Sequence, residues 1–498
     1  MTPAIPPLEL LTALLAAGGL VVAIASTVLP RAAHAIGAIG ACLLAGLTAL
    51  LVVVFAGSDD SITTVALGGW QAPLGVMLRL DGLAVVMLAM TAVTFLAGSL
   101  YALGYVERPA ARRQFWPLWL WLWAALDLLF LSGDAFNLYV TLELVGLAAV
   151  ALVALAGSVA AVVAAMRYLL VSLMGSMAYL MGVALLYGQY GVLDLVGLTA
   201  LVAGEAAVPP ATLLAAALMT AGLMFKAALL PLHLWLAPAH GAAPAPVSAV
   251  LSALVVAAAF YLLLRLWLGV FAPLATPGLG VLLGLLGVIA LVWGALQALR
   301  AARLKYLVAY STVAQLGYLL LAFPLMQIEP GAWKAVVFLA VAHALAKGAI
   351  FLAAGTLQQA AGHDRLADLG PVLRAHGPTV FALGLAGMSL VGLPPTGGFL
   401  AKYLLLKSAL PGMIAGPGGI GVALALFWVV AILGGGMLAG AYVVRMVAPA
   451  FHRGARERGQ RVSAWMVWTP LLLALAAVVL GALGAPFMGV IDHTTGGA

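Results

Sequence analysis

Charged residues are scarce in this chain of 498 residues. Asp, Glu, Lys and Arg make up 7% of it, whereas hydrophobic residues make up 65% and the mean hydropathy is +1.20. A soluble globular domain carries roughly 25% charged residues. The composition therefore excludes a soluble protein and indicates a polytopic membrane protein.

Cysteine and long polar segments are also nearly missing. The single cysteine, Cys42, lies in an apolar run, which excludes disulfides and metal clusters ligated by several thiolates. No polar stretch of the sequence is long enough to form a soluble catalytic domain. We therefore expect no cofactor and no metal in this chain. It would be part of an enzyme, as a translocase, only if other subunits supplied redox chemistry.

Apolar runs recur between residues 8 and 483, separated by short polar breaks. A helix needs ~20 apolar residues to cross hydrocarbon about 30 Å thick, so the pattern predicts about fourteen transmembrane helices. The 57 glycines, together with many alanines, favour close contact between such helices. The predicted fold class is an all-α polytopic bundle.

Basic residues are concentrated in every second connection between the predicted helices. The positive-inside rule places those connections in the cytoplasm, which predicts a multi-pass protein of the inner (plasma) membrane with both termini outside. The alternate connections carry acids and only Arg79 and Lys334 as bases. The basic clusters are Arg31; Arg108, Arg112 and Arg113; Arg300, Arg303 and Lys305; Arg365 and Arg374; and Arg453, Arg456, Arg458 and Arg461. The acids of the alternate connections are Asp59, Asp60, Asp81, Asp194, Glu205 and Glu329.

The remaining bases lie within or at the ends of predicted helices. A charge at a helix centre costs ~2.5–3.5 kcal/mol on insertion scales, so a base that persists there marks an ion pathway. Arg265, Lys407 and Arg445 lie toward segment ends, where we expect them to reach the headgroups. The bases without that explanation are Arg167, Lys226, Lys347 and Lys402.

Three acids lie in apolar sequence, namely Asp127, Asp134 and Glu143. Glu143 is well inside the run 136–155 and needs a partner, for which Lys226 is the candidate. Burial disfavours the charged form of each group and a close pair favours it, so making and breaking the pair can load and release protons. A static ion pair that holds helices together is the alternative. Asp127 and Asp134 are expected nearer the membrane edge.

Two of the predicted helices are interrupted by proline. Lys226 precedes PLHLWLAPAH at 231–240, and GLPP at 392–395 precedes Lys402. Proline removes a backbone donor and clashes with the preceding turn, so each helix breaks near membrane depth and frees polar backbone groups. The lysine stands before one break and after the other, which favours an inverted-topology repeat. Two unrelated proline kinks are the alternative.

A histidine and a lysine stand four residues apart farther along the chain. His343 and Lys347 share one face of a predicted helix, within reach of a proton relay. A histidine that merely packs by hydrogen bonding is the alternative.

Several motifs, in order, resemble one family. They are SGDAFNLY at 132–139 with Glu143; Lys226 through PAH at 238–240 into APAPVS at 243–248; LK at 304–305 with AYSTVAQLG at 309–317; HALAK at 343–347; and GLPP with Lys402. Over roughly residues 80–445 the chain is similar to the antiporter-like subunits shared by Mrp-type multisubunit cation/proton antiporters and the membrane arm of respiratory complex I. The length and the DAFNLY segment are most similar to the D subunit of the Mrp antiporter.

The resemblance implies fourteen helices with two inverted five-helix repeats, each holding a discontinuous helix. Glu143 and Lys226 would form the charge pair of the first half-channel, His343 and Lys347 the central link, and Lys402 the gate of the second. Arg167 would exchange pairing with Glu143. The implied organisation is a three-helix segment at 1–115, the first repeat at 116–270, the second at 271–450, and a basic loop with the last helix at 451–498.

One position departs from the family pattern. Relatives usually carry a lysine in the helix after the first broken one, and Ala257 stands there in this chain. Ser248, Ser252, His240 and water remain to connect Lys226 with His343. Either protons cross there through water, or the first half-channel is uncoupled from the second.

These observations predict a proton-translocating subunit of a multisubunit monovalent cation (Na+)/proton antiporter, with other membrane subunits and the lipid bilayer as its partners and no nucleic acid. The alternatives are a proton-pumping subunit of an NADH-quinone oxidoreductase or membrane-bound hydrogenase, and the membrane subunit of an inorganic-carbon uptake complex. An independent transporter of organic substrates is disfavoured because the sequence carries no signature of such a pocket.

Overall fold

The computed structural model describes residues 8–494 except 59–61, 68–69, 71–74, 416–417 and 458. Asp59, Asp60 and Arg458, which we assigned to connecting loops, lie outside the described residues. Twelve helices of the described part are long and apolar enough to cross a membrane, and α8 and α17 are shorter apolar helices that each begin a broken span. The prediction of an all-α bundle with about fourteen crossings is confirmed.

The first part of the bundle holds six long helices and a β-hairpin. They are α1 (Leu8–Val28), α2 (Ala33–Ala56), β1 (Ile62–Ala66), β2 (Met77–Asp81), α3 (Gly82–Tyr105), α4 (Pro109–Leu131), α5 (Ala135–Ala154) and α6 (Val159–Tyr190).

The middle part contains the first broken span and a π-helical turn. Its elements are α7 (Leu195–Ala203), α8 (Pro210–Lys226), α9 (Leu236–Ala242), α10 (Ala245–Val250), the π-helix η2 (Leu251–Val255), α11 (Val256–Leu268), the 3-10 helix η3 (Ala272–Leu274) and α12 (Pro277–Arg300).

The last part contains the second broken span. Its elements are α13 (Leu304–Leu320), α14 (Ala322–Met326), α15 (Ala332–Ala361), the 3-10 helix η4 (Leu366–Asp368), α16 (Gly370–Ala375), α17 (Gly377–Val391), α18 (Gly397–Ala415), α19 (Gly418–Val447), the 3-10 helix η5 (Ala448–Ala450), α20 (Ala464–Ala482) and α21 (Gly484–Asp492).

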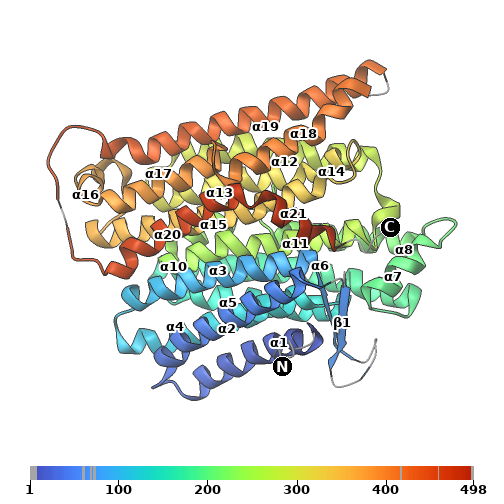
Figure 1. Cartoon of the computed structure of the whole chain (residues 1–498), viewed down its shortest axis with the longest axis horizontal. Helices are drawn as coiled ribbons and strands as arrows, with labels where there is room; N and C mark the ends of the chain where they lie inside the picture. Colours follow the sequence, from blue (N-terminus) through green and yellow to red (C-terminus); the bar gives the residue numbers. More distant parts are fainter. Residues whose placement is uncertain are drawn as a thin grey trace.

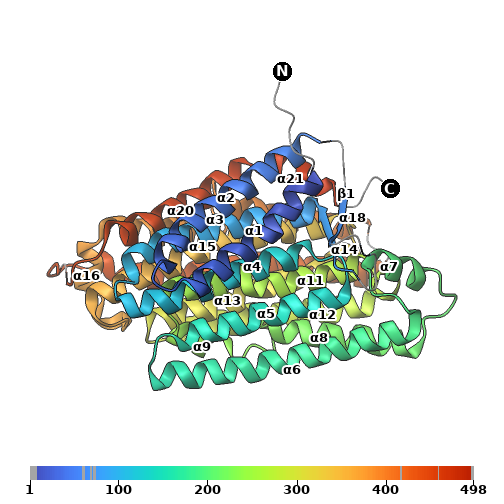
Figure 2. The ribbon, with the colours of Figure 1, turned by 90° about the horizontal axis from the view of Figure 1, so that it is seen from below.

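The long helices run side by side along one direction, with α1 and α19 at opposite edges of the bundle in Figure 1. α15 lies in the middle and contacts α3, α10, α13, α17, α18 and α20. The apolar windows of α15 and of the α10–α11 span are buried completely, whereas fewer than half of the residues in those of α6 and α19 are buried. Figure 2 shows α6 along the lower edge with α8 beside it. The buried centre therefore consists of α10, α11 and α15.

Both broken spans occur where proline predicted them. α8 ends at Lys226 and α9 begins at Leu236, with Pro231 between them, and α17 ends at Val391 before Pro394. Gly392, at φ 90°, adopts the left-handed conformation that ends α17 and that side chains other than hydrogen rarely tolerate. The two breaks are thus structural facts, while the inverted repeat remains a prediction.

The β-hairpin between α2 and α3 was not predicted. β1 and β2 pair antiparallel, with Ile62 opposite Asp81, and Asp81 then caps α3 by accepting a bond from the Ala84 amide at 3.0 Å. Thr494, just after α21, lines one cavity with Ile62 and Arg79 of the hairpin. α21 therefore ends at the hairpin side of the bundle, which α1 also contacts.

Candidate functional site

Glu143 on α5 and Lys226 at the end of α8 form an ion pair inside the bundle. Lys226 Nζ donates to Glu143 Oε2 at 3.3 Å and to the carbonyl of Leu142 at 3.2 Å. Ser176 on α6 donates a short hydrogen bond to the same carboxylate oxygen. The structure thus brings together the pair that the sequence predicted, although the role of the pair in transport remains a prediction.

Glycines make room for the Lys226 side chain. A Cβ added at Gly146 on α5 would lie 3.2 Å from Lys226 Nζ, and one added at Gly175 on α6 would lie 3.2 Å from Lys226 Cγ. Small residues at such positions let helices approach closely. The break after Lys226 is covered by Trp235, whose indole N–H donates to the carbonyl of Phe225 at 2.9 Å.

Lys347 on α15 is completely buried and bonded only to uncharged groups. Its Nζ donates to the carbonyl of Val308 at 2.7 Å and to Ser311 Oγ at 2.5 Å, both on α13. His343 lies one turn earlier on the same helix, and neither of its ring nitrogens has a hydrogen-bond partner within the described residues. The two residues share a face of α15, as predicted.

Lys402 on α18 reaches back across the second break. Its Nζ donates to the carbonyls of Leu390 and Val391 at 2.7 and 2.9 Å, the last carbonyls of α17. It also lies 4.7 Å from the ring centroid of Tyr318. Within the part of the chain that the structure describes, no carboxylate pairs with Lys347 or Lys402. The two amines are therefore held by dipoles and an aromatic face.

His240 on α9 packs against α15. Its buried ring stacks on Phe351, one turn beyond Lys347 on α15, at 4.7 Å between centroids. Neither ring nitrogen has a partner among the residues described. Ser248 donates to the His240 carbonyl at 3.1 Å, and Ser252 bonds to Thr312 at 2.8 Å.

Ala257, where the resemblance led us to expect a lysine, is buried in α11 two residues after η2. π-helical turns are rare overall, and those that occur are often found at functional sites. The π-helical turn ends just before the position where the lysine was expected.

Arg167 does not pair with Glu143 in this structure. It is exposed on α6, where it lines a cavity with Arg303 and Tyr306. It precedes Ser176, the α6 residue that contacts Glu143, by nine residues, or roughly 13 Å of helix at 1.5 Å per residue. An exchange of pairing would need a large movement of the arginine side chain.

Arg265 is the clearest error of the sequence analysis. We expected it to reach the headgroups, but it is only 8% exposed and makes two bonds of 2.8 Å to the carboxylate of Asp81. Arg79 adds a third contact at 3.0 Å. Burial raises the pKa of Asp81, but the charges of Arg265 and Arg79 more than offset burial, so the pKa lies below its usual value. The expectation failed because the partner of Arg265 is far away in the sequence.

One further placement was wrong. Lys305 was assigned to a basic loop, yet it is 3% exposed in the first turn of α13 and donates to the carbonyl of Ala243 at 2.7 Å. Asp127 is 1% exposed and lies four residues before the end of α4 at Leu131, so its place near the membrane edge stays a prediction. Asp134 caps α5 by accepting a hydrogen bond from the Asn137 amide at 2.6 Å, which fits a residue at the edge of the membrane.

Lys407 and Arg445 are exposed, as predicted. The sequence feature that could have placed Lys305 in a helix is the apolar run that begins beside it.

The described residues contain no group of three or more His, Cys, Asp or Glu side chains that could hold a metal ion. The titratable side chains described for the candidate site are amines, imidazoles and one carboxylate. Broken helices and charged side chains within membrane spans are features that recur in membrane transporters.

The chain belongs to the family described as NADH:quinone oxidoreductase/Mrp antiporter, transmembrane, whose model matches residues 132–427. That range includes the whole candidate site from Glu143 to Lys402. The resemblance inferred from the motifs is thereby confirmed.

The relatives fall into more than one functional group. The N subunit of the NADH-quinone oxidoreductase of Desulforudis audaxviator is 33% identical over 432 residues, 83% of this chain and 83% of that protein. The D subunit of the Na(+)/H(+) antiporter of Alkalihalophilus pseudofirmus is 27% identical over 364 residues, 72% of this chain and 73% of that protein. A chain of the membrane-bound sulfane sulfur reductase, an archaeal respiratory membrane complex, is 26% identical with a TM-score of 0.85 and covers 97% of this chain and 96% of that one.

Proposed function

We propose that this chain is the proton-translocating subunit of a multisubunit monovalent cation (Na+)/proton antiporter. The observation that carries the proposal is the partly buried Glu143–Lys226 pair at 3.3 Å, placed where α8 breaks. The proposed location is the inner (plasma) membrane, with the basic connections in the cytoplasm and both termini outside, because the bases cluster in every second connection. Its proposed partners are the other membrane subunits of such a complex.

The Glu143–Lys226 pair would act as a switch. While the carboxylate contacts Nζ, the charged lysine is stabilised. When the carboxylate moves away, the ammonium group loses its only counter-charge in the described contacts and gives up a proton to the next base. Ser176 would hold the carboxylate in the closed position through its hydrogen bond.

The following groups would carry the proton toward the second break. His240 lies after the first break and stacks against α15, Lys347 and His343 lie on α15, and Lys402 spans the second break. The two breaks would belong to inverted repeats at 116–270 and 271–450, with the lysine on opposite sides of each break. Backbone carbonyls at broken helices are suited to hold a cation that arrives and leaves.

A second candidate is the proton-pumping membrane subunit of a redox complex. It is favoured by the relative named for NADH-quinone oxidoreductase, which is 33% identical to this chain. The buried charges would be used in the same way, and the electron chemistry would lie on other subunits.

Proton flux in inverted membrane vesicles distinguishes the two candidates. The complex that contains this chain is expressed in a host without its own cation/proton antiporters, and no electron donor is added. We expect addition of Na+ or K+ to move protons across the vesicle membrane. Flux that appears only when an electron donor is oxidised would contradict the antiporter and support the redox complex.

The gap at Ala257 gives a separate prediction. We expect Ala257→Lys to leave cation-dependent flux unchanged, because His240 already stands next to α15. The buried ammonium should instead lower thermal stability in detergent, by ~2.5–3.5 kcal/mol on insertion scales. Ala257→Met, of similar length without charge, is the control. A gain of flux in the lysine variant alone would mean that the gap limits transport.

A further inference from the structure

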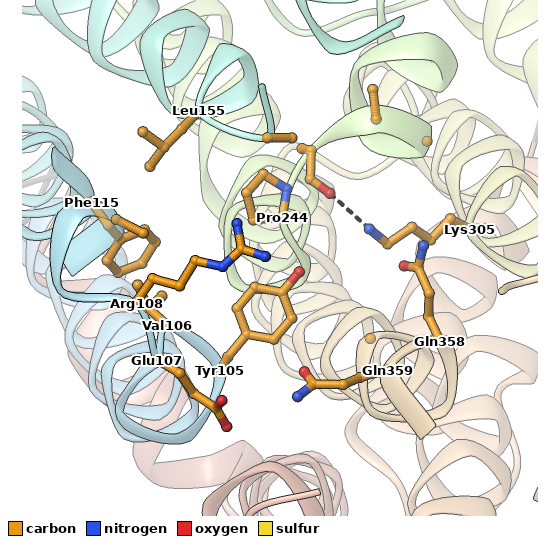
Figure 3. A pocket seen from close by; sticks show the side chains of 16 residues that line it. Tyr105, Val106, Glu107, Arg108, Phe115, Leu155, Pro244, Lys305, Gln358 and Gln359 are labelled. Atoms are coloured by element: carbon orange, nitrogen blue, oxygen red, sulfur yellow. Dashed lines mark hydrogen bonds between the residues drawn. The ribbon is translucent and has the colours of Figure 1, made fainter. Parts of the chain in front are cut away.

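A cavity of about 540 Å³ opens among the connections that carry the basic residues. Its wall is formed by Tyr105 and Arg108 between α3 and α4, Pro244 after α9, Lys305 on α13, and Gln358 and Gln359 on α15 (Figure 3). A water molecule occupies ~30 Å³ in the liquid, so the cavity has room for several. Polar groups from four parts of the fold therefore surround a space that water can fill.

Lys305 is the deeply buried base of this wall. One of its N–H groups donates to the carbonyl of Ala243, shown as the dashed line in Figure 3. The nearby Asp364 is bonded to Arg303 at 2.7 Å, and no carboxylate pairs with Lys305 within the described chain. A lysine ammonium has three donors. The ammonium of Lys305 is therefore tied by one carbonyl and otherwise borders the cavity.

Lys305 is also connected to the candidate site through two neighbouring residues. Ala243, which accepts its bond, is three residues after His240 at the end of the same short helix. Val308, whose carbonyl binds Lys347, is three residues after Lys305 on α13. Three helical residues span about 4.5 Å along the axis. Lys305 thus bonds to a residue about one turn from His240, and it lies about one turn before the residue whose carbonyl binds Lys347.

We propose that Lys305 takes up protons from this cavity and passes them to His240, an inference that rests on the proposed proton-translocating function. The Lys305 ammonium gives one N–H proton to the unpaired ring nitrogen of His240, directly or through a water, and becomes a neutral amine. A proton from the cavity then restores the ammonium. The neutral imidazole has one nitrogen that accepts, and both His240 nitrogens lack partners among the described residues.

A purely structural role would explain the same hydrogen bond. Lysine near the end of a helix can satisfy its last carbonyls, and Lys305 does so for α9. Arginine separates the two roles, because a guanidinium keeps the charge and the donor but does not release a proton in proteins. If Lys305 only caps α9, the Lys305→Arg variant should keep its flux. If Lys305 carries protons, that variant should lose it.

The test measures cation-dependent proton flux of Lys305→Arg and Lys305→Gln in vesicles that hold equal amounts of the assembled complex. We expect both variants to lose flux on the order of 100-fold, the scale on which positioned proton-transfer groups act. Wild-type flux in Lys305→Arg would overturn the proposal and leave a helix cap. Arg300→Gln, which removes an exposed base from the same face, is the matched control and should keep full flux.

Glu143→Gln in the same vesicles separates failure of this inference from failure of the proposed function. If Glu143→Gln loses flux while both Lys305 variants keep it, only the uptake role is wrong. If Glu143→Gln also keeps flux, the proposed translocation through the buried charges is wrong.

Chemical labelling tests the cavity without relying on variants of Lys305. In a Cys42→Ala background, Gln359→Cys places one thiol on the cavity wall. We expect a charged, membrane-impermeant thiol reagent to react from the cytoplasmic side and to lower flux relative to the same vesicles before labelling. Reaction only from the outer side, or full reaction without loss of flux, would overturn uptake through this cavity.

Discussion

Glu143→Gln is expected to lower cation-dependent proton flux on the order of 100-fold. Without the carboxylate, Lys226 must carry its charge deep in the bundle with no counter-ion in its described contacts. An uncompensated charge at a helix centre costs ~2.5–3.5 kcal/mol on insertion scales, and each 1.36 kcal/mol added to a barrier slows a step about tenfold. The amide keeps the size of the side chain and its contact with Ser176.

The control for this prediction is Lys407→Gln, which removes an exposed charge from the same bundle and should keep its flux. The amount of assembled complex in the vesicles is measured for each variant, so that loss of protein is not mistaken for loss of transport. Near-normal flux in Glu143→Gln at equal amounts of complex would reduce the pair to a structural ion pair.

Asp81→Asn is expected to destabilise the fold by ~3–5 kcal/mol, the usual cost of removing one partner from a buried pair. Arg265 would be left buried with no carboxylate, after losing two bonds of 2.8 Å. The pair also joins β2 to α11, which are 184 residues apart at the two bonded positions. The measurement is the thermal unfolding midpoint of the purified complex in detergent.

Arg79→Gln is the matched control for Asp81→Asn. Its side chain is 18% exposed and makes a single contact with Asp81, so only a small loss of stability is expected. Equal midpoints for the two variants would contradict the role given to the Asp81–Arg265 pair. Because the pKa of Asp81 is lowered in the fold, the contribution of the pair is present at neutral pH. It is lost only as the pH falls below the ordinary range of a carboxyl group, about 3.9.

The buried charges are of two kinds, which the flux and stability measurements separate. Asp81 and Arg265 are joined by two hydrogen bonds and a third contact from Arg79, so neither group is free to change its protonation. Lys226 has one carboxylate, and Lys347 and Lys402 are held by uncharged groups. Few strong partners leave an amine able to gain and lose a proton.

The sequence by itself determined the membrane class, the number of crossings, the two breaks and the Glu143–Lys226 pair. Each of these features depends on a short stretch of sequence. The hydrocarbon thickness fixes the length of an apolar run, and proline, which lacks a backbone N–H, marks a break in a helix. A charged residue within an apolar run is rare and therefore stands out. Only the tertiary structure decided that Arg265 binds Asp81, that Lys305 is buried at the wall of a cavity among the basic connections, and that Arg167 is exposed. Residues within a turn of a helix end look alike in sequence, and the packing of distant helices decides whether they meet lipid, water or a partner.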